Sequence, residues 1–387
     1  MWCWVVSLSA SLAFAEPPPT PVLRDGELDA ATAAGVPNTV VTGAEAMGLS
    51  PSFVVEVRTG LELLYQRQYD ATLAYFSGVE QRWSGVVIDD VAEVLVWQAR
   101  MLENFDYRFE KEYEAASSRA RKGLEAAQRV PGNDAWERLM LTGVSGIEAI
   151  HAARRGRYLA ALTLAFEAID HVERTREAAP DFVDLQLADG LYNYWRTVLT
   201  NQSSLLPSFG DHRKKGIAQM EAVQEAGLFL GPPATLSLSY TWFEEQDNEK
   251  LMEACARNHN AYPDNIISET MYGIALLKLK KYGEAIEAFE HIRTVDPSNR
   301  RSLYWSGRAH QKDRQYDEAL AIYTTYLVEA VEPYHSSWTH YRIGQIHEVQ
   351  KAYDTSERHY RTAIKIDGHK DSKVALERVR KKRRLAE

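Results

Sequence analysis

Three histidines near the end of the chain are the residues whose type and spacing come nearest to a metal site. His340 and His347 stand two helical turns apart, so a helix would place them on one face, and His335 precedes them closely. Imidazole nitrogens are common zinc ligands. No carboxylate or cysteine completes the set, so scattered core or surface histidines are the favoured interpretation. We therefore predict no metal ion and no cofactor.

Catalytic signatures are missing from the sequence. It has no G-x-x-x-x-G-K-[ST] phosphate loop, no G-x-S-x-G elbow, no H-E-x-x-H pair and no C-x-x-C motif. Glu244, Glu245 and Asp247 are neighbouring acids, but we expect them in a turn, without the cleft that paired catalytic carboxylates need. The chain is predicted not to be an enzyme. The alternative is a catalytic site on the loop at 201–211.

A basic run near the C-terminus is the most conspicuous block of charge. Arg378, Arg380, Lys381, Lys382, Arg383 and Arg384 could contact anionic lipid or nucleic acid. The favoured interpretation is a solvated helix end, where cations are stabilised by the helix dipole. The net charge of −9 argues against a nucleic-acid partner. A peripheral membrane adaptor that uses this basic helix remains an alternative.

These residues must be positioned by a repeating helical framework. Ser239, Gly273 and Gly307 are small residues spaced 34 apart (273 − 239 and 307 − 273), and Pro263 and Pro297 each follow 24 residues after the first two. Alanine, leucine, glutamate, arginine and lysine dominate the middle of the chain, and these residues favour helix. Hydrophobic residues make up 45% of the chain, which excludes wholesale disorder. The sequence predicts antiparallel helix pairs that repeat every 34 residues.

The residues inside one repeat indicate how its two helices would pack. A small residue such as Gly273 allows the first helix to approach the second, Ala285 does the same from the opposite side, and Phe289 fills the remaining space. Cys255 falls at the position of this large core residue, so we expect a buried thiol. Pro297 ends the second helix because proline cannot continue it. One pair cannot bury its apolar face alone, so neighbouring pairs must stack.

This order of residues resembles the tetratricopeptide repeat, and the whole chain resembles bacterial exported proteins that contain such repeats. The resemblance implies an all-α fold, an α-solenoid of antiparallel helix pairs, that acts as a non-enzymatic scaffold and binds another protein or a peptide. It also implies a peptide-binding groove lined by the first helices of the repeats. Carried over by position, the groove residues are Tyr240, Phe243, Thr270, Ile274, Tyr304, Arg308, Gln311, Trp338, Tyr341 and Gln345. Thr270 and Ile274 replace the lysine and asparagine of carboxylate-clamping relatives, which argues against a receptor for chaperone tails.

The N-terminus resembles an export signal. Residues 1–15 form an apolar run that ends Ala13-Phe14-Ala15, as in a cleaved signal peptide, although no cation precedes the run. A proline- and alanine-rich linker is expected at 16–50. The predicted location is therefore the periplasm or cell envelope, with no membrane span after cleavage; a cytoplasmic protein is the alternative. The expected divisions that follow are irregular repeats at 51–231, regular repeats at 232–368 and a basic capping helix at 369–387, with Val374, Leu376 and Val379 as its apolar residues.

Overall fold

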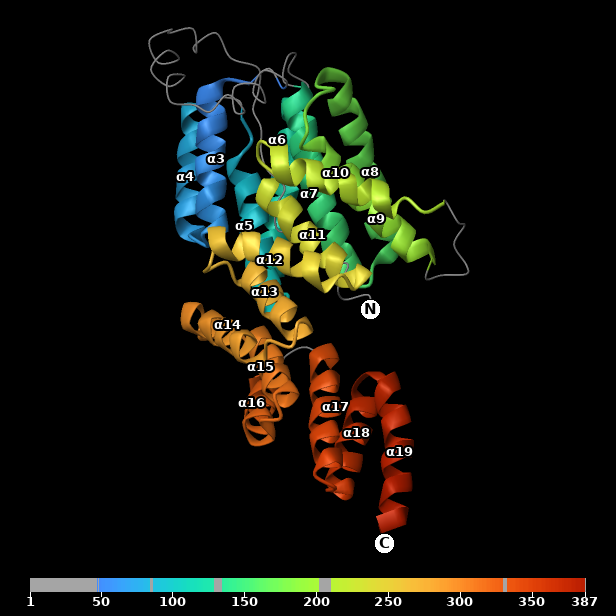
Figure 1. The fold of residues 1–387 in the computed structure, drawn as a ribbon. Helices are drawn as coiled ribbons and strands as arrows, with labels where there is room; N and C mark the ends of the chain where they lie inside the picture. Colours follow the sequence, from blue (N-terminus) through green and yellow to red (C-terminus); the bar gives the residue numbers. More distant parts are fainter. Residues whose placement is uncertain are drawn as a thin grey trace. The chain divides into compact units, whose positions relative to one another are not determined.

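The computed structural model describes residues 47, 49–83, 86–128, 134–201, 210–329 and 333–386. Within these ranges 17 helices account for all the regular structure, and they form two compact units (Figure 1). The predicted signal peptide, nearly all of the linker and most of the 201–211 loop lie outside the described residues. No described helix is both long enough and apolar enough to cross a membrane.

The first unit runs to Asn265, without the short segment Glu103–Asp106. Consecutive helices pack as pairs, and Arg119 also joins two of them through ion pairs with Asp90 and Glu93. Its helices are α3 (Pro51–Tyr65), α4 (Tyr69–Arg82), α5 (Asp89–Asn104), α6 (Glu110–Ala127), α7 (Asp134–Arg154), α8 (Tyr158–Ala178), α9 (Leu185–Asn201), α10 (Arg213–Ala226), α11 (Gly231–Glu245) and α12 (Asn248–Ala261).

The second unit contains Glu103–Asp106 and residues from Ile266 onward. Asn299 anchors the short segment by donating a hydrogen bond to the carbonyl of Glu103 at 3.0 Å. Its helices are α13 (Ile266–Lys278), α14 (Tyr282–Val295), α15 (Arg301–Lys312), α16 (Tyr316–Glu329), α17 (Pro333–Val349), α18 (Tyr353–Asp367) and α19 (Lys370–Ala386). The division at 265/266 follows compactness, whereas the predicted boundary at 231/232 follows repeat regularity and stays a prediction.

A glycine facing an aromatic ring 16 residues later holds the regular pairs together. A Cβ atom placed on Gly273 would lie 2.6 Å from two ring carbons of Phe289, and one on Gly307 would lie 2.6 Å from Tyr323. The same clash recurs at Gly60 with Phe76 and at Gly344 with Tyr360. These distances are shorter than van der Waals contact, so only glycine lets the two helices approach this closely. The predicted role of Gly273 is confirmed, and so is the burial of Cys255, at 1% exposed.

The turn within each pair repeats as well. Gln246, Lys280, Arg314 and Lys351 all have φ between 60° and 65°, in the left-handed region. They are spaced 34, 34 and 37 residues apart, which includes the three-residue slip before Gly344. A non-glycine residue in this region costs about 1 kcal/mol, so packing of the two helices must outweigh the local preference.

The α9–α10 pair keeps the close approach despite its longer loop. Gly190 and Gly216 face each other, and a Cβ on either would lie within 2.8 Å of the other's carbonyl oxygen. Their separation is 26 residues (216 − 190), ten more than the 16 of the regular pairs. The extra residues are therefore accommodated in the loop between the helices.

A buried carboxylate fixes the start of α11. Asp184 is 2% exposed and accepts three backbone hydrogen bonds, from Leu228 at 2.6 Å, Phe229 at 2.8 Å and Leu230 at 2.7 Å. These three N–H groups lie in the segment that leads into α11, which begins at Gly231, so this acid satisfies backbone donors that would otherwise be buried without a partner. Nothing in the repeat pattern pointed to it.

The last helix packs against the pair before it. Leu376 and Val379 are buried on α19 and join Tyr360 in an apolar cluster. Val374, predicted together with them as an apolar residue of this helix, is instead 69% exposed. In an α-helix residues 374 and 376 point in different directions, and 376 and 379 share the inner face.

Candidate functional site

The first helices of the three regular pairs in the second unit form one continuous surface. Helix α13 contacts α15, and α15 contacts α17, so these helices lie side by side. We call this surface the A-helix face and define it by α13, α15 and α17. It is the surface on which most of the predicted groove residues fall.

Several of the predicted aromatic and small residues contribute packing to this face. Thr270 is fully buried, and Tyr304 is only 4% exposed, with its ring 5.2 Å from that of His335. Trp338 is half-buried against His369, with ring centroids 4.4 Å apart, and Tyr341 packs 5.1 Å from the same imidazole. The burial of Thr270 and Tyr304 leaves them almost no surface to offer a ligand.

Cations occupy the more accessible part of the A-helix face. Arg308 is partly buried, with its guanidinium 4.8 Å from the ring centre of Trp305. Arg342 lies 5.2 Å from the ring of Trp338 and donates a hydrogen bond to Gln345 at 3.0 Å. Stacking on aromatic rings orients guanidinium groups without neutralising their charge.

Gln311 and Tyr304 connect these cations to the helices around them. Gln311 donates to the carbonyl oxygen of Arg342, at 3.4 Å, and accepts from the Tyr323 hydroxyl at 3.0 Å. The Tyr304 hydroxyl interacts with both Arg308 and Arg342. The guanidinium groups are therefore held in place by neutral partners.

Positive charges lie close together on the A-helix face. Burial lowers the pKa of Lys278, and the charge of Arg308 lowers it further. Lys312 has its pKa lowered by burial and then by both Arg308 and Arg342. Neither Arg308, Lys312 nor Arg342 forms an ion pair with any acid among the residues that the structure describes. A set of clustered cations without carboxylates is chemically suited to binding an anion.

Comparison with known proteins agrees with this arrangement. The sequence model of a tetratricopeptide repeat family matches residues 270–334, which span α13 to the start of α17. The chain therefore contains tetratricopeptide repeats in this segment. A search of curated protein sequences finds no match to it.

One solved structure supports the fold over most of the chain. The structure entitled APC/C hetero-tetramer Cut9–Hcn1 is similar over 82% of this chain and 54% of that chain, at 12% identity and a TM-score of 0.56. Two further structures have lower TM-scores. A tetratricopeptide repeat protein from Parabacteroides merdae is 13% identical over 73% of this chain and 98% of that chain, with a TM-score of 0.44. The structure of pilF from Pseudomonas aeruginosa is 12% identical over 62% of this chain and 98% of that chain, with a TM-score of 0.45. The fold is thus an all-α solenoid of helix pairs, and folds of this kind generally serve as protein-interaction scaffolds.

Two predicted groove residues lie outside the second unit. Tyr240 and Phe243 belong to α11 in the first unit, where Tyr240 is 1% exposed and Phe243 is partly buried. Ile274 lies on α13 but is 1% exposed. The residues with surface to offer on the A-helix face are Arg308, Gln311, Trp338, Tyr341 and Gln345 from the predicted set, together with Lys278, Lys312 and Arg342, which sequence reasoning missed.

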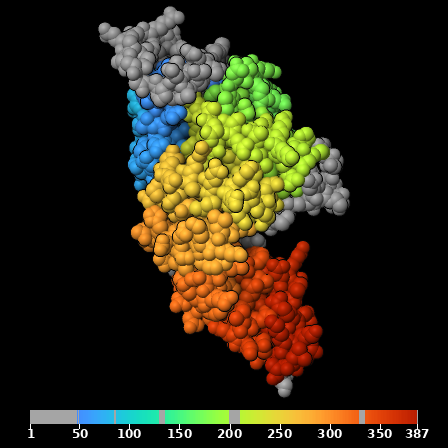
Figure 2. Space-filling model, viewed as in Figure 1, coloured from blue at the N-terminus to red at the C-terminus, as the bar shows by residue number. Residues whose placement is uncertain are grey.

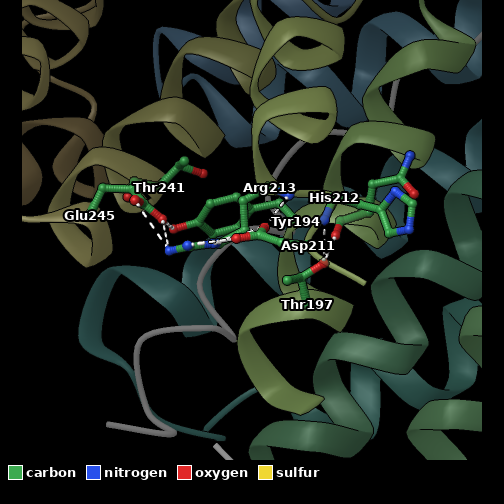
Figure 3. Close-up of polar contacts among 8 residues, drawn as sticks. Tyr194, Thr197, Asp211, His212, Arg213, Thr241 and Glu245 are labelled. Atoms are coloured by element: carbon green, nitrogen blue, oxygen red, sulfur yellow. Dashed lines mark hydrogen bonds and ion pairs between the residues drawn. The ribbon is translucent and has the colours of Figure 1, made fainter. Parts of the chain in front are cut away.

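The described residues that follow the inserted loop form a network of hydrogen bonds and ion pairs with α9 and α11 (Figure 3). Arg213 donates to Asp211 at 2.8 Å and to Glu245 at 3.1 Å, and the Tyr194 hydroxyl donates to Glu245 at 2.9 Å. Hydrogen bonds from Arg213 lower the pKa of Asp211 to about 2, so this carboxyl is ionised at neutral pH. Such a group is a poor general acid. Asp211 contacts Arg213, and Arg213 in turn connects this segment to Glu245 at the end of α11.

The three histidines that are close in the sequence, His335, His340 and His347, do not form one cluster in the structure. His335 packs between Phe105 and Tyr304, whereas the Nδ1 atom of His340 lies 3.0 Å from that of His359 on α18. The ring of His347 lies 5.9 Å from that of His359. Burial and the two neighbouring imidazoles lower the pKa of His359 to about 4, so this ring is expected to be neutral at pH 7, and burial lowers the pKa of His340 as well.

One other group of possible metal ligands occurs in the described part of the chain. Oxygen and nitrogen atoms of Glu110, Glu114 and His151 lie within 4.8 Å of one another. Glu110 is already ion-paired with Arg155, and burial together with Arg154 lowers the pKa of His151 to about 4. The adjacent arginines compete with any cation for these carboxylates.

The basic run at the C-terminus is used within the second unit. Arg378 and Lys382 donate to the buried carboxylate of Glu348 at 2.7 and 2.9 Å, while Arg380 and Arg383 pair with Glu357. Burial alone would raise the pKa of Glu348, but these hydrogen bonds outweigh it and lower the pKa to about 2. Four of the six cations therefore fasten α19 to α17 and α18.

Proposed function

We propose that this protein is a non-enzymatic scaffold that binds an acidic segment of a partner protein on the A-helix face of its second unit. The observation that carries the proposal is the group of clustered cations, Arg308, Lys312 and Arg342, which has no acidic partner among the described residues. Carboxylates of a bound peptide would relieve the repulsion between these cations and accept their hydrogen bonds. Trp338 and Tyr341, half-exposed beside Arg342, add apolar contact area of the kind that dominates peptide interfaces.

Peptide binding can be measured directly. The probe is a fluorescein-labelled peptide of alternating glutamate and tyrosine, and its matched control has glutamine at every glutamate position. The acidic peptide should bind and the glutamine peptide should not. Affinity should fall as salt is raised from 50 to about 300 mM, because the contact is electrostatic.

Variants connect the binding to this face. Arg308→Gln and Arg342→Gln should each weaken the acidic peptide about tenfold, the expected effect of losing one charge-assisted contact. Lys365→Gln is the matched control, because Lys365 is an exposed cation on α18, outside the A-helix face. Equal binding by all three variants, or equal binding of both peptides, would overturn the proposal.

We further propose that the protein acts in the cell envelope. The support is the N-terminal apolar run, which ends in the small-residue pattern of a cleavage site. Cell fractionation with N-terminal sequencing of the purified protein tests this. A mature chain that starts after Ala15 in the periplasmic fraction is the expected result, and an intact Met1 in the cytoplasm would contradict it.

The alternative of a peripheral membrane adaptor has less support. Four cations of the basic run are paired with acids of α17 and α18, so the charge available for anionic lipid is much reduced. Flotation with vesicles that contain phosphatidylserine distinguishes the two functions. Binding that survives Arg308→Gln but is lost when the basic run is neutralised would favour the adaptor.

A further inference from the structure

Helix α8 presents an apolar stripe to solvent. Leu159 is 83% exposed, Leu162 51% and Phe166 59%. Their spacing of three and four residues places them on one face of the helix, and we call these three residues the α8 stripe. Large hydrophobic side chains grouped in this way on a soluble surface indicate an interaction site, whereas single exposed ones do not.

The first unit does not need this face for its own packing. The opposite side of α8 supplies the buried residues Ala168, Val172 and Thr175, and the helix packs there against α7 and α9. In Figure 2 atoms coloured green, the colour of this part of the chain, lie on the visible surface of the first unit. The stripe is therefore a second apolar face of a helix that has already buried one.

Charges at the two ends of the helix indicate what covers the stripe. Arg157, just before the helix, is exposed, and the exposed acids Asp170, Glu173 and Glu177 continue the line of the stripe beyond Phe166 at the same three- and four-residue spacing. Arg157, Glu173 and Glu177 form no ion pair within the described residues. The surface of a partner that covers this face should thus be apolar opposite the stripe, acidic near Arg157 and basic near Glu173 and Glu177.

A second copy of the same helix, running in the opposite direction, has this arrangement. We propose that two copies of this protein associate through the α8 stripe about a two-fold axis. The midpoint of Leu159 and Phe166 falls between Leu162 and Thr163, so each Leu159 would meet the other copy's Phe166. The basic beginning of each α8 would then approach the acidic half of the other, whereas a parallel arrangement would bring acids onto acids.

Cysteine cross-linking tests this geometry in the full-length chain with Cys3→Ser. A residue on the two-fold axis meets its own counterpart, so Thr163→Cys, at an exposed position, should form an intermolecular disulfide under mild oxidation. Glu177→Cys is the control. It lies 14 residues from Thr163, about 21 Å along the helix, so two copies would be roughly 40 Å apart and should not cross-link. The native thiol, Cys255, is buried and should not interfere.

Sedimentation measures the association itself. The unmodified protein should be dimeric at micromolar concentration, and Leu162→Glu should raise the dissociation constant at least tenfold while leaving the melting temperature unchanged. Val328→Glu, which alters a residue that is 82% exposed on α16, should leave the dimer intact. A monomer at all concentrations would overturn the proposal. So would cross-linking of Glu177→Cys as readily as Thr163→Cys, because parallel helices place every residue beside its own counterpart.

Discussion

Replacing Gly273 by alanine tests whether the small-to-large contact determines the stability of a repeat. The new Cβ would lie 2.6 Å from Cε1 and Cζ of Phe289, a ring that is fully buried. Overpacking of a filled core costs about 1–3 kcal/mol, while alanine gains about 1 kcal/mol over glycine in helix propensity. We therefore expect a net loss of about 1 kcal/mol in the free energy of unfolding of the second unit.

The matched control lies one helix away. Gly283 is also helical, on α14, but a Cβ there would meet nothing within 4 Å. Gly283→Ala should therefore be neutral or stabilising by up to about 1 kcal/mol. Urea denaturation followed by circular dichroism compares the two variants in the same unit.

A compensating change makes the reasoning sharper. Phe289→Leu shortens the side chain that Gly273→Ala would strike, so the double variant should be more stable than the sum of the single effects predicts. If Gly273→Ala is as stable as Gly283→Ala, or if the two changes at positions 273 and 289 are additive, the contact does not have the importance assigned to it.

Three other outcomes are expected from the described contacts. The pKa of His359 is lowered to about 4, below its unfolded value near 6.5. The unfolded chain therefore takes up a proton first, and the free energy of unfolding should fall as the pH drops from 6.5 toward 4. His359→Gln should reduce this pH dependence in thermal melts at a series of pH values. Arg378→Gln removes one of the partners of the buried Glu348 and should cost about 1–2 kcal/mol, measured by urea denaturation, whereas Lys381→Gln should cost nothing. Asp184→Ala leaves three backbone N–H groups without their acceptor and should cost about 3 kcal/mol or more, and an unchanged melting temperature would contradict the role assigned to this acid.

Much of the fold could be predicted because its determinants are local. The spacing of Gly273, Ala285 and Phe289 encodes which faces of two successive helices meet, and the same spacing recurs at Gly307 and Gly344. The helix pairs and the burial of Cys255 follow from such patterns. Val374 was misassigned because an apolar side chain by itself does not reveal which side of a helix it occupies.

The candidate site depends on contacts between different repeats, which periodicity does not encode. Arg308 was predicted for the A-helix face, but Lys278, Lys312 and Arg342 were not, because their mutual repulsion exists only once α13, α15 and α17 lie side by side. The aromatic residue Tyr304 was assigned to the surface by position, and packing against its neighbours buries it.

The sequence by itself determined the repeating unit, its period and the residues that hold each helix pair together, since these depend on neighbours within one 34-residue segment. Only the tertiary structure decided that His340 meets His359 in place of His335, and that most of the basic run is paired with Glu348 and Glu357. It also decided that the α8 stripe is left exposed. Electrostatic interactions and solvent exposure depend on distances in space, and residues far apart in sequence set those distances only when the helices have stacked.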